Sequence, residues 1–201
     1  MHAPRTPHLD AIDRILRYLK GSPGKGIWMR KNGTNAICGY SDADWAGSFD
    51  RKSTTGFCTF VGGNLVTWKS KKQNVVARSS AEAEYRAMAS TASELTWIKQ
   101  VLTDLNVKTN EPMQMFCDNQ AARHIAANPI FHERTKHIEV DCHYIREKIQ
   151  AQEIETPFVK SEDQLADIFT KGLSSKVFEN ISCKLGLYDL YNPSLRGSVE
   201  K

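Results

Sequence analysis

The stretch NAICGYSDADWAG, residues 35–47, and the stretch TTGFCTFVGGNLVTWKS, residues 54–70, decide the fold of this chain. Both are rich in the β-branched and aromatic residues that favour strands, and the Gly-Gly-Asn sequence at 62–64 supplies a tight turn. The pattern predicts three short strands in succession. Strands that follow one another so closely pair as an antiparallel meander.

A long helix is predicted next, from about residue 80 to about residue 105. Ser79 and Glu82 stand at capping-box spacing at its start, and apolar residues recur at helical spacing from Met88 to Leu105. Shorter elements follow in the order strand, helix, helix, strand, helix, at 113–118, 119–127, 137–150, 154–159 and 161–173. This order predicts an α/β fold in which a five-stranded mixed sheet, its first three strands antiparallel, is flanked by helices.

Composition limits the kind of protein that carries these elements. The chain has 201 residues, 40% of them apolar, which is enough for a single core. No apolar stretch approaches the roughly 20 residues that span a bilayer, and the N-terminal MHAPRTPHLD lacks the apolar segment of a secretory signal. The five cysteines are widely spaced and form no CxxC pair, which indicates a reducing compartment. We therefore expect an intracellular protein of the cytoplasm or nucleus, neither secreted nor bound to a membrane.

The first segment, HLDAIDRILRYLKGSPGKG at 8–26, predicts a short amphipathic helix that ends at Gly21 and Pro23. Its apolar residues have no partner within so short a segment. We therefore expect the helix to dock on the residues that follow or on a neighbouring protein. A boundary is expected near residue 33.

Helical periodicity separates two glutamates at the start of the long helix. Glu84 lies four residues before Met88, so it shares the side of the helix that faces the sheet. Glu82 lies about 200° away in helical projection and is expected to cap the helix.

Two strands of the predicted sheet end in aspartates. Asp42 and Asp44 lie two apart and therefore on one face of the first strand, and periodicity does not choose between them. Asp118 follows an apolar strand, where a charge is costly unless a proton, a cation or hydrogen bonds compensate it. If these strands are neighbours, their ends adjoin each other and the start of the Glu84 helix, so a cluster of acids is predicted.

Five motifs stand in order along the chain: YSDADWAG, SKKQNVVARSSAEAEYRA, CDNQAA, HERTKHIEVDCHYIREKI and QLADIFTKGL. In this order and spacing they resemble the ribonuclease H region at the C-terminal end of the Pol polyprotein of plant copia-type LTR retrotransposons. The resemblance covers nearly the whole chain. The opening RILRYLKGSPGKG resembles the stretch that follows the polymerase core of the reverse transcriptase, and nothing resembles the polymerase's catalytic motif, the integrase or the protease.

The resemblance implies a ribonuclease H-like fold and a division of the chain into three parts. Residues 1–33 would be a remnant of the C-terminal or connection segment of the reverse transcriptase. Residues 34–175 would form the ribonuclease H-like domain, and residues 176–201 would be a C-terminal tail.

The resemblance also assigns the acids. The family's catalytic and metal-binding acids match Asp42, Glu84, Asp118 and Asp167. They would hold two Mg²⁺ ions, or Mn²⁺, because such cations prefer oxygen ligands. Asp44 is left as a turn or supporting residue. The histidine that some cellular members carry before the last acid has no counterpart in VKSEDQLAD, which leaves the route of product release open.

A basic cluster precedes the Glu84 helix, and its members are the candidates for nucleic-acid contacts: Trp68, Lys69, Lys71, Lys72 and Arg78. Composition alone fits a solvated loop equally well. Histidine pairs His132/His137 and His137/His143 have spacings of five and six, which place neither pair on one helical face, so a zinc site is disfavoured.

The function implied by the resemblance is hydrolysis of the RNA strand of RNA–DNA hybrids during reverse transcription, alongside the reverse transcriptase of the same element. One alternative is a catalytically inactive Pol fragment that binds nucleic acid or docks on a polymerase. A transposase-like nuclease of the same fold class is disfavoured by the sequence around Asp42, Glu84 and Asp118.

Overall fold

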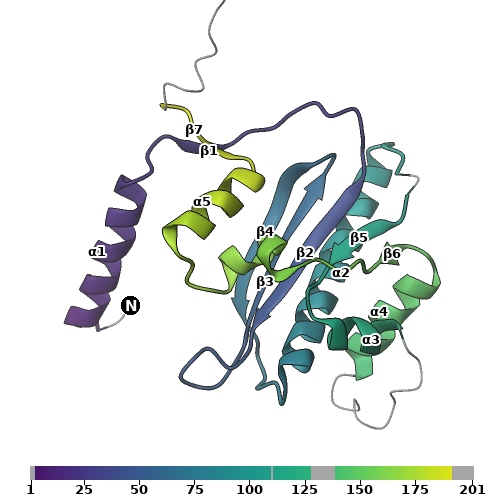
Figure 1. The fold of residues 1–201 in the computed structure, drawn as a ribbon, viewed down its shortest axis with the longest axis horizontal. Helices are drawn as coiled ribbons and strands as arrows, with labels where there is room; N and C mark the ends of the chain where they lie inside the picture. Colours follow the sequence, from purple (N-terminus) through teal and green to yellow (C-terminus); the bar gives the residue numbers. More distant parts are fainter. Residues whose placement is uncertain (1–2, 110, 128–138, 192–201) are drawn as a thin grey trace, which may run out of the picture.

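The centre of the molecule is a five-stranded sheet in the order β4-β3-β2-β5-β6 (Figure 1). The computed structural model describes residues 3–109, 111–127 and 139–191. The strands are β2 (Ile37–Asp44), β3 (Thr54–Val61), β4 (Asn64–Lys72), β5 (Met113–Phe116) and β6 (Ile154–Glu155). β2, β3 and β4 pair antiparallel, whereas β5 runs parallel to β2 and β6 parallel to β5. The predicted mixed sheet with its first three strands antiparallel, flanked by helices, is confirmed.

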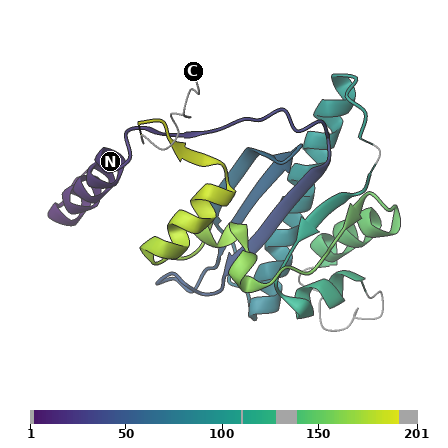
Figure 2. The ribbon, with the colours of Figure 1, turned by 45° about the horizontal axis from the view of Figure 1, so that its top comes forward.

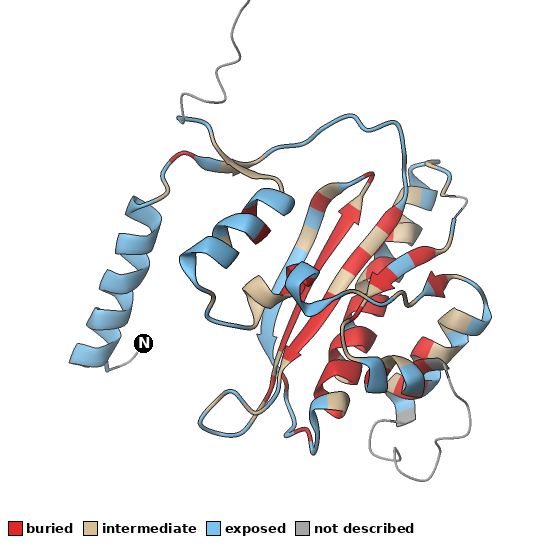
Figure 3. Ribbon diagram, in the orientation of Figure 1, coloured by how far each residue is buried: buried red, intermediate tan, exposed pale blue. Residues whose placement is uncertain are grey.

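Each face of the sheet is covered by different elements (Figure 2). On one face lie α2 (Ser80–Asp104), α3 (Gln120–Ala127) and α4 (Glu139–Gln150), whose apolar side chains form one core with β5 and β6. On the other face, α5 (Ser175–Lys184) and the short turn η3 (Leu165–Phe169) pack against β3 and β4. The buried residues therefore gather on both faces of the central strands, as Figure 3 shows.

The start of α2 is fixed by reciprocal capping. The Ser79 hydroxyl accepts a hydrogen bond from the Glu82 backbone N–H at 3.2 Å. The Glu82 carboxylate in turn accepts from the Arg78 backbone N–H at 2.8 Å and forms an ion pair with Arg86 at 3.0 Å. Glu82 thus caps the helix as predicted. In a capping box its carboxylate would accept from the N–H of the N-cap residue Ser79, whereas here it accepts from the N–H of the preceding residue, Arg78. Glu82 is itself buried.

The segment 161–173 is not the single helix that its sequence predicts. It forms two 3₁₀ turns, η2 (Ser161–Asp163) and η3, separated by Gln164 in an extended conformation. The Gln164 side chain is fully buried, donates to the Ser41 carbonyl at 2.9 Å and accepts from the Ala166 N–H at 3.1 Å. These bonds anchor the segment to β2, and the tertiary contact overrides the local preference for a helix.

The residues of α5 and β7 (Leu187–Asp189) are part of the packed structure. Ile181 and Leu185 are buried in the same core as Phe60 and Leu65. β7 pairs antiparallel with β1 (Lys25–Ile27) in a separate two-stranded sheet. The boundaries expected near residues 33 and 175 stay predictions.

The N-terminal helix α1 (Thr6–Lys20) stands apart from the sheet and has no buried residue (Figures 1 and 3). Its apolar side chains, including Leu9, Ile15 and Leu19, are more than half exposed. Tyr18 meets the ring of Phe178 on α5 edge to face, with 6.4 Å between the ring centres. Within the described ranges, no helix has the length and apolar character needed to cross a membrane.

Candidate active site

Asp42 lies near the end of β2 with only 1% of its surface exposed. It is opposite Gly56 of β3, and this glycine allows η3 and Thr170 to lie directly on the sheet. The Thr170 hydroxyl donates a hydrogen bond to Asp42 Oδ2, and Lys171 Nζ lies 3.2 Å from Asp42 Oδ1. The buried carboxylate is therefore compensated by a hydroxyl and an ammonium group, both from the segment after η3.

Asp167, a residue of η3, lies near Asp42. Lys171 Nζ lies 2.7 Å from Asp167 Oδ1, so a single ammonium group bridges Asp42 and Asp167. Burial raises the pKa of the Asp167 carboxyl against the opposing effect of Lys171, and the Asp42 carboxylate raises it further. Burial disfavours the charge of Lys171, but the hydrogen bond to Asp167 and the negative charge of Asp42 raise the pKa of the ammonium above its usual value.

Glu84 points toward the sheet from the first turns of α2, as its periodicity predicts, and only 6% of its surface is exposed. Its Oε2 atom is buried and has no hydrogen-bond partner among the described residues. Burial, and then the charges of Asp42 and Asp118, raise the pKa of the Glu84 carboxyl to about 9. A carboxyl in this position holds a proton at neutral pH unless a cation replaces it.

Asp118 directly follows β5 and accepts a hydrogen bond from the Ser161 hydroxyl of η2 at 2.7 Å. Potential ligand atoms of Glu84, Cys117 and Asp118 all lie within 4.8 Å of one another. Cys117 was not a candidate from the sequence. Burial raises the pKa of its thiol to about 12, so at neutral pH it remains a thiol, a poor partner for a hard cation.

These groups fit a site for hard divalent cations. The predicted acids Asp42, Glu84, Asp118 and Asp167 come from β2, α2, the end of β5 and η3. In addition to burial, the charges of Asp42 and Asp118 raise the pKa values of both Glu84 and Asp167. Carboxylate oxygens are the ligands that Mg²⁺ and Mn²⁺ prefer, and the unpartnered Glu84 oxygen is the group most in need of a cation.

One further acid and the histidines of two pairs were singled out in the sequence beside the four acids. Asp44 is the last residue of β2, and its carboxylate lies against Gly47, where a Cβ atom would be 1.8 Å from Asp44 Oδ2, so its side chain packs on the turn that follows the strand. His132 and His137, from the disfavoured zinc pairs, lie outside the described residues.

Two further residues were missed by sequence reasoning. Thr170 and Lys171 both stand in QLADIFTKGL. The only local signal was the spacing of four between Asp167 and Lys171, which on a turn of helix brings opposite charges together.

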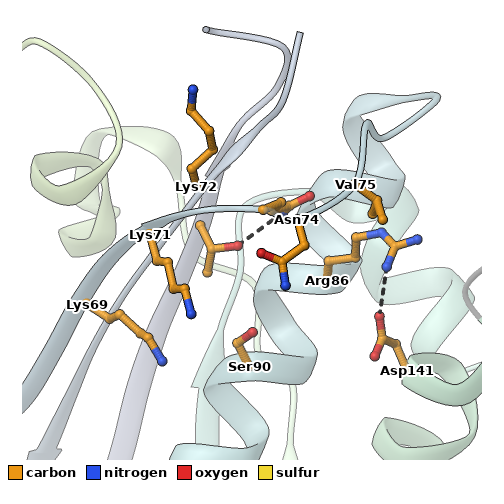
Figure 4. A pocket seen from close by; sticks show the side chains of 10 residues that line it. Lys69, Lys71, Lys72, Asn74, Val75, Arg86, Ser90 and Asp141 are labelled. Atoms are coloured by element: carbon orange, nitrogen blue, oxygen red, sulfur yellow. Dashed lines mark hydrogen bonds and ion pairs between the residues drawn. The ribbon is translucent and has the colours of Figure 1, made fainter. Parts of the chain in front are cut away.

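The basic cluster is divided between the two faces of β4. Trp68 and Lys72 share the face that carries Asp42, whereas Lys69 and Lys71 lie on the face toward α2. Lys69 and Lys71 line a pocket of about 400 Å³ with Asn74 and Arg86, and Lys72 lies at its edge among the lining residues. Figure 4 shows these two lysines pointing the same way and Lys72 pointing away from them.

The remaining members of the cluster differ in their ion pairs and in their exposure to solvent. Lys72 forms an ion pair with Asp50 at 3.1 Å. Trp68 is 52% exposed, and Arg78 is an exposed residue just before the start of α2. The structure therefore gathers the three lysines around one pocket, whereas Trp68 and Arg78 are not among its lining residues.

Several curated relatives match nearly the whole chain, among them two from different plants. Over 188 residues it is 46% identical to the retrovirus-related Pol polyprotein from transposon RE1 of Arabidopsis thaliana, a match that covers 93% of this chain and 13% of that protein. Over 187 residues it is 36% identical to the retrovirus-related Pol polyprotein from transposon TNT 1-94 of Nicotiana tabacum, covering 92% of this chain and 14% of that protein. The chain thus spans a small part of the length of these relatives. No family model matches it.

Among solved structures, the chain is similar to LC11-RNase H1 isolated from compost, with a TM-score of 0.48, 16% identity, and coverage of 68% of this chain and 93% of that one. LC11-RNase H1 in complex with an RNA/DNA hybrid gives a TM-score of 0.49, 13% identity, and coverage of 67% and 93%. The protease-reverse transcriptase of prototype foamy virus gives a TM-score of 0.44, 13% identity, and coverage of 79% and 21%.

Proposed function

The chain belongs to the retrovirus-related Pol polyproteins of plant copia-type retrotransposons, and from this membership we propose that it is their ribonuclease H module. Its reaction is hydrolysis of the RNA strand of RNA–DNA hybrids during reverse transcription. The observation that carries the proposal is the convergence of four carboxyl groups, from separate elements, at one end of the sheet.

The residues that would hold the divalent cations are Asp42, Glu84, Asp118 and Asp167. When bound, such ions activate a water on one side of a phosphodiester and neutralise the leaving 3′ oxygen on the other. The hydroxyl groups of Thr170 and Ser161 fix the orientations of the Asp42 and Asp118 carboxylates, so these two ligands are held in place before any cation arrives.

The substrate is held by its backbone and its shape. RNA paired to DNA is distinguished by groove shape and by 2′-hydroxyl groups, so no base-specific contact is needed. Lys69, Lys71, Lys72 and Arg78 are the proposed phosphate contacts, and the exposed ring of Trp68 is a proposed surface for packing a sugar.

One observation favours the alternative of an inactive fragment that docks on a polymerase. The apolar side of α1 is exposed along its whole length, which suits a helix that has lost or awaits a protein partner.

One assay separates the two functions. The purified chain is incubated with a labelled RNA–DNA hybrid, with Mg²⁺ or with a chelator, beside single-stranded RNA and double-stranded DNA. Cleavage of only the hybrid's RNA strand, and only with the divalent ion, is the expected result. Binding of the hybrid without cleavage would favour the docking fragment, and cleavage of double-stranded DNA would exclude the ribonuclease assignment.

Replacing both Lys69 and Lys71 by Gln should weaken binding of all hybrid sequences alike. Binding releases counterions from each phosphate that the protein neutralises, so fewer are released when a contact is lost. The slope of log K against log salt should therefore become shallower by about 0.7–0.9 per lost contact. The measurement is a set of binding titrations at several salt concentrations. Lys72→Gln should have a smaller effect, because the Lys72 ammonium is already paired with Asp50.

Lys108→Gln is the matched control for these lysines. Lys108 is an exposed residue after the far end of α2, beside Ile37 at the opposite end of β2. Its substitution should leave the salt slope unchanged. An unchanged slope in the Lys69/Lys71 variant as well would show that this pocket is solvated surface and not a phosphate site.

A further inference from the structure

Lys171 is placed where a cation is needed. Its ammonium lies 3.2 Å from Asp42 Oδ1 and 2.7 Å from Asp167 Oδ1, between residues that are 129 and four positions away along the chain. Two carboxylates that approach one group this closely repel each other unless positive charge lies between them. Lys171 supplies this charge from within the protein.

The two partners of the Lys171–Asp42 ion pair differ in how far they are exposed to solvent. The Asp42 side chain is 2% exposed and is held by Thr170, whereas the Lys171 side chain is 39% exposed. A lysine ammonium stands on a flexible four-carbon stem and is readily hydrated. Lys171 can therefore leave the pair for solvent, while Asp42 cannot leave the site.

We propose that the Lys171 ammonium is the resident counter-ion of the Asp42–Asp167 pair and that a divalent cation binding to this pair must displace it. The proposal rests on the proposed function, since it concerns the same carboxylates. It makes Lys171 a positioning residue: it holds the two carboxylates together and competes with the cation for them.

The Glu84–Asp118 pair and the Asp42–Asp167 pair, which form the two ends of the acid cluster, should differ in their affinity for a cation. The Glu84–Asp118 end contains a buried carboxyl oxygen without a partner, and a cation gains that oxygen without displacing a charged side chain. The Asp42–Asp167 end is already neutralised in part by Lys171. Cations should therefore bind with two different affinities. Lys171 contacts Asp42 and Asp167 directly, so it should weaken mainly the weaker of the two.

The test is Lys171→Gln in the full chain, with two measurements that need no substrate. Titration with Mn²⁺, followed by the loss of the free ion's electron paramagnetic resonance signal, gives the affinities. Thermal unfolding in a chelator gives the stability without metal. The weaker Mn²⁺ affinity should rise about tenfold, within the usual range of coupling between two bound groups, and the unfolding temperature in the chelator should fall.

Two variants control this test. Lys171→Arg keeps the charge and should retain the parent's stability without metal. Lys184→Gln removes an ammonium that is also 39% exposed and lies 2.8 Å from Asp163, and it should change neither reading. An affinity that is unchanged or lower in Lys171→Gln would overturn the proposal, as would an unchanged unfolding temperature. Because neither reading depends on cleavage, a failure of the ribonuclease assignment would be seen separately.

Discussion

Asp118→Asn is expected to reduce cleavage of hybrid RNA by about a thousandfold or more while the protein stays folded. Asn keeps the shape of the side chain, and its carbonyl can still accept the hydrogen bond from the Ser161 hydroxyl. It lacks the negative charge that binds a cation. Without metal, the loss of this charge removes repulsion between Asp118 and Asp167, whose pKa the Asp118 charge raises, so stability should be equal or higher. Single-turnover cleavage rates and thermal unfolding measure the two effects.

Asp163→Asn makes the same chemical change nearby, on η2, where the carboxylate is exposed and paired with Lys184. It should cleave hybrid as fast as the parent does. If Asp118→Asn were equally active, Asp118 would not be a ligand and the proposed site would be wrong.

Gly56→Ala should impair both stability and cleavage, through packing and without changing any charge. A Cβ atom on Gly56 would lie 2.5 Å from Thr170 Cγ2, closer than real contacts allow, and 3.0 Å from Phe169 Cβ, which is tighter than most real contacts. Overpacking of this kind costs about 1–3 kcal/mol of unfolding free energy. The clash would move Thr170 and with it Asp167, and a displacement of about 1 Å at a catalytic site costs about a hundredfold in rate.

Denaturant unfolding and cleavage rates test the Gly56 variant. Gly26→Ala is the control, because Gly26 also lies in a strand and a Cβ atom there would have no neighbour within 4 Å. A Gly56→Ala protein with the parent's rate would mean that η3 does not need its close contact with β3 to position Asp167.

Local patterns were sufficient to predict the elements that bear three of the four acids. The meander and the long helix follow from periodicity, and the same periodicity placed Glu84 on the sheet side of α2. Periodicity did not choose between Asp42 and Asp44, because both lie on one face of β2. The family resemblance made that choice, and the contact of Asp44 with Gly47 agrees with it.

Features that depend on distant contacts could not be predicted in this way. The segment 161–173 has a helical composition, but its conformation is set by the hydrogen bond from Gln164 to Ser41, 123 positions away. Lys171 was missed for the same reason, since its contact with Asp42 joins residues far apart in the chain. The packing of Ile181 and Leu185 depends on a sheet face that a tail sequence does not reveal.

The β1–β7 pairing has a mechanical consequence. Lys25 lies opposite Asp189, and the Leu190 N–H donates to the Gly24 carbonyl at 2.9 Å, so the chain reaches and leaves this ribbon at the same end. Interstrand hydrogen bonds in an antiparallel pair run perpendicular to the strands. Tension applied between the residues before Lys25 and those after Asp189 therefore loads one hydrogen-bonded pair at a time and opens the ribbon like a zip. As long as the ribbon stays paired, such tension is borne by its hydrogen bonds and does not act on β2 or η3, so the spacing of the four carboxyl groups is unchanged until all three residue pairs have opened.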